Sequence, residues 1–285
     1  MTKNPDVIAV SGFSRGGTSL VWNLLNSHPD ICAPLSETNE IVENNRSLRV
    51  LFRFPTSMRG RRGRIARWWV DRSFHQAKLA ALDHEDLQFK SPGEVYTKDK
   101  ASSCTLALKS IDGGIRLTDG LLHVYPNLAI ICVVRNGYAV LEGSLRRGLD
   151  PEVVGRRYAR NGARMVELSL RHRRTRIVKF EDVLREPFNA AERMYEFVGL
   201  PKHDTGLLRL KAKGVIDDTG SHNPRFGQLD RYYWISRDEI STAVDPRVDD
   251  RQALRLDRSS IEAFLRHAEP VMDHFGYLDS ALEDQ

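Results

Sequence analysis

The feature that most constrains the fold lies near the start of the chain, where a short apolar run leads into a glycine-rich loop. The run VIAV occupies residues 7–10, and GFSRGGTSLVWNLLNSHPDI extends from Gly12 to Ile31. Gly12 and Gly17 fit the G-x-x-x-x-G frame of phosphate-binding loops, which join a strand to the start of a helix. Backbone N–H groups at such a helix start converge on an anion. The sequence therefore predicts an α/β fold with an anion site in this loop.

Two departures separate this loop from the common nucleotide-binding arrangement. Thr18 and Ser19 stand where such a loop has lysine followed by serine or threonine. The apolar run at 128–135, a predicted central strand, ends in Arg135 instead of the aspartate that organises Mg²⁺. An ATPase or kinase of the usual kind is therefore disfavoured. A P-loop nucleotide or small-molecule kinase remains the alternative function, and a glycine-rich turn without a ligand is a second alternative.

The rest of the sequence alternates between β-rich and helical patterns, which favours a parallel sheet covered by helices. Further strands are predicted at 104–110, 128–135 and from 175. Helices are predicted at 17–27, 117–125, 137–147, 152–173, 186–198 and 259–277. The predicted fold class is α/β: a three-layer fold like that of P-loop NTPases, in which helices flank a central parallel sheet and helical and loop insertions cover the active site. We expect a single domain over residues 1–285, with an insertion at about 44–100 and a cap or lid loop at about 214–236.

Composition narrows the possible functions. The 285 residues include 43 Lys and Arg against 38 Asp and Glu, a formal net charge of +5. These basic residues are spread along the chain, so a nucleic-acid-binding protein is the less favoured reading. Cys32, Cys104 and Cys132 form no CxxC pair and no histidine has metal-ligand spacing, so no metal site is predicted. With no signal peptide and no apolar run of membrane-spanning length, we expect a cytoplasmic protein.

The loop and its helix resemble a known family, the sulfotransferases that use 3′-phosphoadenosine 5′-phosphosulfate (PAPS). FSRGGTS followed by LLNSHPDI is similar to their 5′-phosphosulfate loop, particularly in the tyrosylprotein and bacterial branches. The resemblance implies PAPS as donor co-substrate without a metal. It also implies that the loop holds the donor, through Ser14, Arg15, Gly16, Gly17, Thr18 and Ser19.

Two later stretches extend the resemblance to about residue 201. The family's second motif is an arginine after a buried strand, with a serine eight residues later, and both hold the 3′-phosphate. Arg135 matches this arginine, whereas Gly143 occupies the position eight residues on and Ser144 follows at nine. Arg146 or Arg147 would then share the phosphate. The third stretch, VKFEDVLREPFNAAERMYEFVGLP at 178–201, is similar to a structural signature of the family.

The resemblance also implies which residues carry the chemistry. Glu37, in the segment SET, matches the general base of the tyrosylprotein branch, with Glu40 as a competing candidate and a capping or surface role as the alternative. Lys109 precedes Arg135 by 26 residues, the separation of a catalytic lysine in that branch, although a lysine at a strand end is often a surface residue. Arg15 and Lys109 would flank the transferred sulfuryl group.

Two arginine-rich stretches bear on partners. Arg225 and Arg231, in the predicted lid with several aromatic residues, are candidates for the 3′-phosphate. Arg46–Arg72 contains nine arginines and several large apolar residues, a pattern that suits an acidic acceptor or the surface of an anionic membrane. A solvated helix face with tryptophans in the core is the alternative. The expected acceptor is a small molecule, carbohydrate or lipid with a hydroxyl group, and no nucleic acid is expected.

Overall fold

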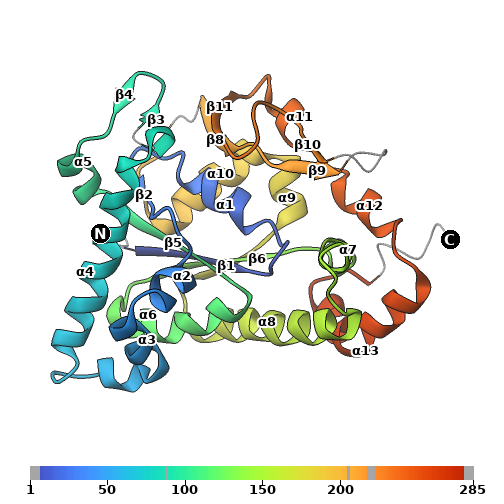
Figure 1. Cartoon of the computed structure of the whole chain (residues 1–285), viewed down its shortest axis with the longest axis horizontal. Coiled ribbons are helices and arrows are strands. Elements are labelled where there is room, and N and C mark those ends of the chain that lie inside the picture. The colour runs from blue at the N-terminus through green and yellow to red at the C-terminus, as the bar shows by residue number, and fades with distance from the viewer. Residues whose placement is uncertain (1–6, 88, 204–205, 217–221, 279–285) are drawn as a thin grey trace.

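A five-stranded parallel sheet forms the centre of the fold (Figure 1). The computed structural model describes residues 7–87, 89–203, 206–216 and 222–278. The strand order is β2-β5-β1-β6-β7. The strands span Ile31–Cys32 (β2), Thr105–Ile111 (β5), Val7–Gly12 (β1), Ala129–Val134 (β6) and Thr175–Lys179 (β7). β1 is the central strand, with β5 and β2 on one side and β6 and β7 on the other. The strand order therefore changes direction at β1, and ligands of α/β proteins bind at the carboxyl ends of the strands at such a switch point.

Both faces of the central strands are buried, as their apolar sequences predict. Every residue of β1 and of β6 is buried. Since side chains alternate along a strand, Val7 and Ala9 join one hydrophobic cluster whereas Ile8 and Val10 join the other. The result is one apolar core on each side of the sheet.

Helices cover both cores and complete the three layers (Figure 1). On one face lie α6 (Leu117–Val124), α8 (Pro151–Arg171) and α13 (Arg258–His274). On the other lie α1 (Thr18–Leu25), α9 (Phe180–Arg185) and α10 (Pro187–Val198). This arrangement confirms the predicted fold class.

The predicted insertion lies between β2 and β5. It is mainly helical, and it includes α3 (Arg46–Arg53), α4 (Arg64–Ala80), α5 (Lys98–Ser103) and the short hairpin of β3 (Phe89–Ser91) with β4 (Glu94–Val95). It is preceded by α2 (Thr38–Glu43). None of the helices in the described ranges is long and apolar enough to cross a membrane.

The predicted lid belongs to a set of small antiparallel pairs. β8 (Leu207–Lys211) pairs with β11 (Tyr232–Ser236), and β9 (Gly214–Ile216) pairs with β10 (His222–Pro224). Residues 217–221 of the predicted lid lie outside the described residues. The chain continues through α11 (Ile240–Ala243) and α12 (Val248–Ala253).

Most element boundaries differ from the sequence prediction by one to three residues, and the short strand β2 was not predicted. Two of the boundary differences lie beside the glycine-rich loop. β5 continues to Ile111, so Lys109 lies within the strand and does not end it. The helix after β6, α7 (Gly137–Leu145), ends earlier than the predicted residue 147. Gly148 follows with a φ of 74°, a left-handed conformation in which a helix cannot continue.

Candidate active site

The glycine-rich loop at the carboxyl end of β1 presents free backbone N–H groups. Arg15 (φ 63°) and Gly17 (φ 82°) both adopt left-handed conformations, which turn the chain sharply into α1. Within the described residues, the N–H groups of Gly17, Thr18 and Ser19 make no hydrogen bond inside the protein. Unsatisfied N–H groups at the start of a helix attract an anion. The loop therefore has the backbone of an anion site.

Gly17 is fixed in this loop by a close approach as well as by its backbone angle. A Cβ atom at this position would lie 2.0 Å from Cδ2 of Phe180, the first residue of α9. The same ring lies 4.6 Å from the guanidinium of Arg135. Gly17 thus allows the loop to pack directly on α9.

Gly17→Ala is expected to destabilise the protein by roughly 3 kcal/mol or more, because left-handed strain and overpacking add together. Gly148→Ala is the matched control: its φ is also positive, 74°, but no atom lies within 4 Å of the added Cβ. The control is expected to lose only about 1–2 kcal/mol. Urea denaturation of both variants tests this, and equal losses would contradict the role of Phe180.

Glu37, Lys109 and Ser19 form a chain of contacts beside the loop. Lys109 Nζ lies 2.8 Å from Glu37 Oε1 and 3.3 Å from Ser19 Oγ. It also lies 5.5 Å from the centre of the Trp22 ring. The Lys109 and Glu37 side chains are 13% and 20% exposed, so the pair is shielded but still open to solvent. Three residues predicted from separate stretches of sequence are therefore in contact at the start of α1.

Glu37 and Glu40 have different roles in the local structure. Glu37 is the N-cap residue of α2, and its backbone N–H donates to Oε2 of Glu40 at 3.1 Å. Glu40 is exposed, and its carboxylate accepts from the start of its own helix. Thr38 Oγ1 donates to the Lys109 carbonyl at 2.9 Å, which ties the start of α2 to β5. Glu37, and not Glu40, thus has its carboxylate at Lys109.

A carboxylate that the sequence analysis missed also contacts the loop. The N–H of Ser14 donates to Oδ1 of Asp112 at 2.8 Å, so this amide is already paired. Burial raises the pKa of Asp112 above its usual range. Asp112 directly follows β5, so its position at the carboxyl end of a strand was the available signal.

The side chain of Arg15 extends toward α7. A Cβ atom on Gly143 would lie 3.3 Å from Cγ of Arg15, so the stem of Arg15 covers the position where the family has its serine. Desolvation, and then the positive charges of Arg147 and Arg146, lower the pKa of Arg15. Arg15 also lines a small cavity of about 40 Å³, with Ser14, Asp112, Ser144, Arg147 and Arg157 among its other lining residues.

Ser144 is buried at this cavity, and its hydroxyl donates to the Val140 carbonyl at 2.7 Å. Its neighbour Arg157, on α8, was not anticipated from the sequence. The structure therefore brings Ser14, Arg15 and Ser144 to one cavity, at which further arginines gather.

Arg135 is buried in a network of acids at the carboxyl end of β6. Its Nη2 lies 2.6 Å from Oδ1 of Asp249 and 2.6 Å from Oε1 of Gln252, both on α12. Its Nε lies 3.1 Å from each carboxylate oxygen of Asp249, and its Nη1 donates to the Arg15 carbonyl at 2.5 Å. Neither Asp249 nor Gln252 was anticipated, because 114 residues separate Asp249 from Arg135.

Glu181 adds a second carboxyl group beside this pair. Its Oε1 accepts from the N–H of Asn136 at 2.7 Å and its Oε2 from the Tyr277 hydroxyl at 2.7 Å. Burial, and then a hydrogen bond shared with Asp249, raise the pKa of Glu181 to about 7. Glu181 therefore binds a proton more tightly in the folded chain than in the unfolded one.

This raised pKa predicts a pH-dependent stability. The contribution of Glu181 is complete below its ordinary pKa of 4.5 and is lost as the pH rises through about 7. Glu181→Gln is expected to flatten this part of the stability profile, a change on the order of 1–3 kcal/mol between about pH 5 and pH 8. Urea denaturation at several pH values measures it, and an unchanged slope in the variant would contradict the assignment.

Three of the other predicted cations, Arg146, Arg225 and Arg231, are each paired with an acidic residue of the chain. The guanidinium nitrogen and the carboxylate oxygen are 2.9 Å apart for Arg146 and Glu142, 3.0 Å for Arg225 and Asp245, and 3.2 Å for Arg231 and Asp86.

Lys213, which the sequence analysis missed, lies near the site. Desolvation of its ammonium group, and then the positive charge of Lys109, lower the pKa of Lys213 to about 8, although the residue keeps an exposed surface.

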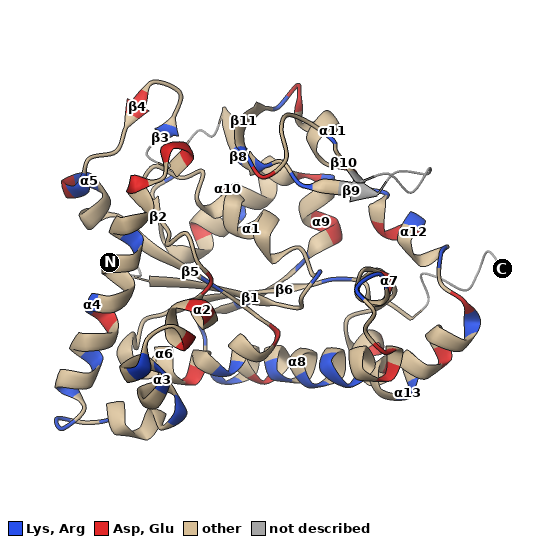
Figure 2. Ribbon diagram, in the orientation of Figure 1, with Lys and Arg blue, Asp and Glu red and all other residues tan. Residues whose placement is uncertain are grey.

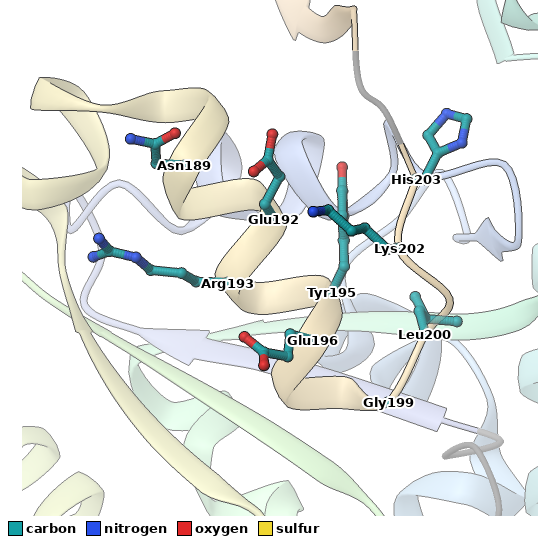
Figure 3. A pocket seen from close by; sticks show the side chains of 9 residues that line it. All are labelled: Asn189, Glu192, Arg193, Tyr195, Glu196, Gly199, Leu200, Lys202 and His203. Atoms are coloured by element: carbon teal, nitrogen blue, oxygen red, sulfur yellow. The ribbon is translucent and has the colours of Figure 1, made fainter.

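A larger pocket lies elsewhere, along α10 (Figure 3). It measures about 510 Å³, and its polar lining includes Glu192, Arg193, Lys202 and His203. None of its lining residues belongs to the loop, to β5 or to α7. Because the converging polar groups lie at the smaller cavity, we place the candidate active site at the loop.

Among the described residues, no cluster of three or more His, Cys, Asp or Glu side chains could hold a metal ion.

The strand order and the loop after the central strand define a class, the α/β proteins with a P-loop-like fold. Residues 5–204, more than half of the chain, match the model of a family described as the sulfotransferase family. The chain belongs to the sulfotransferase family. This confirms the resemblance found in the sequence.

Solved structures are similar over almost the whole chain. The sulfotransferase domain from the curacin biosynthetic pathway is 15% identical with a TM-score of 0.52, covering 97% of this chain and 99% of that domain. This likeness shows the fold. The sulfotransferase domain from the Synechococcus PCC 7002 olefin synthase is 18% identical, with a TM-score of 0.48 and coverage of 94% of this chain and 95% of that one. A search of curated proteins finds no match.

Proposed function

We propose that the chain transfers a sulfuryl group from PAPS to an acceptor hydroxyl, with Glu37 as general base and without a metal. The observation that carries this proposal is the contact of Glu37 with Lys109 and of Lys109 with Ser19 beside the free N–H groups of the loop. These contacts join a base, a cation and an anion site, the parts that in-line transfer of a sulfuryl group requires. Family membership supports the reaction class.

In this proposal the loop holds the donor's 5′-phosphosulfate. Among the described residues, the N–H groups of Gly17, Thr18 and Ser19 have no partner at the start of α1, which favours an anion there, and the Thr18 and Ser19 hydroxyls offer further donors. Gly16 keeps the turn tight, since its own N–H donates to the Phe13 carbonyl at 2.9 Å. No residue of the loop needs to reach a γ-phosphate, because PAPS has none.

The chemical step breaks the bond between sulfur and the bridging phosphate oxygen and forms a bond between sulfur and the acceptor oxygen. Glu37 takes the proton of the acceptor hydroxyl. Lys109 and Arg15 stabilise the negative charge that grows on the departing phosphate. The products are a sulfate ester and 3′-phosphoadenosine 5′-phosphate (PAP), and the proton remains on Glu37 until solvent removes it.

The 3′-phosphate side of the donor site is assigned to Arg135, Ser144, Arg146 and Arg225. The small cavity at Ser144 supports this assignment, because Arg15 and Arg147 line it too. The acceptor is proposed to be a small molecule, carbohydrate or lipid that offers a hydroxyl group.

Calorimetry with PAP and with ATP tests the donor assignment. PAP is expected to bind without Mg²⁺ and ATP is not, and Arg15→Ala is expected to abolish PAP binding. Binding of ATP with Mg²⁺ in place of PAP would favour the kinase alternative. Transfer of labelled sulfate from PAPS to a panel of hydroxyl acceptors then tests the reaction itself.

A further inference from the structure

The arginine-rich stretch Arg46–Arg72 carries an exposed apolar surface that the proposed reaction does not use. On α4, Ile65, Trp68 and Trp69 are 79%, 55% and 41% exposed. Residues three and four apart share one face of a helix, so these three side chains form a continuous patch, which we call the α4 patch. Large apolar side chains grouped in this way mark an interaction surface.

The opposite face of α4 is the one that packs on the domain. Val70 and Phe74 are fully buried, and the Phe74 ring meets the Phe52 ring edge to face at 6.2 Å. The helix is thus anchored by its inner face, and its tryptophans face outward. This overturns, for Trp68 and Trp69, the alternative that these tryptophans belong to the core.

Arginines are frequent along α3, α4 and the chain between them, where they are coloured blue in Figure 2. From residue 46 to residue 70 the chain has eight arginines and no aspartate or glutamate. Asp71 is the first acid, and it contacts His75 at 3.4 Å. Arg72 lies over the Trp68 ring at 5.5 Å, and Arg53 lies over the ring of exposed Phe54 at 5.7 Å. A partner that is complementary to this surface combines negatively charged groups with an apolar region that can bury the tryptophans and Ile65.

We propose that the α4 patch docks the protein on an anionic lipid bilayer. Tryptophans and an aliphatic residue on one face, with arginines beside them, are the pattern of a helix that lies in the membrane interface. A nucleic acid would pair with the arginines, but its polar surface gives no apolar environment to Ile65. This docking does not depend on the transfer reaction, so either proposal can fail without the other.

Vesicle flotation measures the docking directly. The full chain is expected to bind phosphatidylcholine vesicles that contain about 30 mol % phosphatidylglycerol, and to bind pure phosphatidylcholine vesicles at least about tenfold more weakly. Added salt is expected to weaken the binding. Trp68→Ala/Trp69→Ala should lower the partition coefficient by about tenfold or more, and Arg61→Gln/Arg62→Gln by about fivefold per charge.

The matched control lies on α8, where Leu170 and the side chain of Arg171 are 81% and 76% exposed. Leu170→Ala/Arg171→Gln should bind anionic vesicles like the unmodified chain. Thermal melts of every variant establish that the fold is intact. Absence of binding to anionic vesicles at low salt would overturn the proposal, as would unchanged binding by the folded tryptophan variant. Tight binding of a fluorescent single-stranded oligonucleotide through the same arginines, without vesicle binding, would identify the other partner class and overturn it too.

Discussion

Glu37→Gln is expected to lower kcat for sulfuryl transfer by about 10²–10⁴-fold while leaving the affinity for PAP nearly unchanged. The amide keeps the size of the side chain and can still accept a hydrogen bond from Lys109, but it cannot take the proton of the acceptor hydroxyl. Because the carboxylate contacts Lys109 and, within the described part of the chain, no backbone group of the glycine-rich loop, the donor site should remain intact. Single-turnover transfer and calorimetry with PAP measure the two quantities separately.

Glu40→Gln is the natural control for this variant. Glu40 lies one helical turn further on and is exposed, and its carboxylate accepts only the cap hydrogen bond from Glu37 N–H among the described contacts. Its loss should cost about 1 kcal/mol of stability and leave kcat within about twofold. If Glu40→Gln removed turnover and Glu37→Gln did not, the base would be Glu40.

Lys109→Met is expected to lower kcat by about 10²–10³-fold, because it removes a charge from the place where the leaving phosphate becomes more negative. The methionine fills a similar volume under Trp22, so the melting temperature should change little. Rapid-quench measurement of sulfuryl transfer is the direct test.

Lys211→Met provides the comparison for Lys109→Met. Lys211 is a nearby lysine whose ammonium lies 3.0 Å from the exposed carboxylate of Asp230, so its loss should leave transfer nearly intact. The double variant Glu37→Gln/Lys109→Met should lose less than the product of the two single losses, because the residues touch. Additive losses would mean that the pair does not act as a unit.

The sequence was sufficient for β1, β5, β6 and β7, but the two-residue strand β2 was not predicted, because so short a strand has no alternating or continuous apolar pattern. β1 and β6 contain continuous apolar runs, a pattern typical of short strands that are buried on both faces. The direct contact of Glu37 with Lys109 was not predicted either. Glu37 follows β2 and Lys109 lies in β5, and the parallel pairing of these two strands brings the side chains together in the completed fold. Their assigned roles remain predictions.

The acids around Arg135 could not have been predicted in the same way. Asp249 lies on a six-residue helix with no motif of its own, and only the packing of the completed fold brings it to Arg135. Glu181 was noticed only as part of a structural signature, since nothing in FED indicates burial beside a second carboxyl group. Side-chain direction is the missing information: the stem of Arg15 covers Gly143, which a motif spacing cannot show.

The pairing of Arg135 with Asp249 has a consequence for the way an anionic donor would bind. A basic site open to water gathers ions from solution and releases them when a phosphate arrives, so its affinity falls steeply with salt. Arg135, Arg146 and Arg225 are instead each neutralised by a carboxylate of the chain itself. In the proposed donor site, binding on that side would therefore exchange one anion for another within the protein. The affinity for PAP should consequently depend on salt less than the number of arginines suggests, and α12 should move as Asp249 gives up its partner.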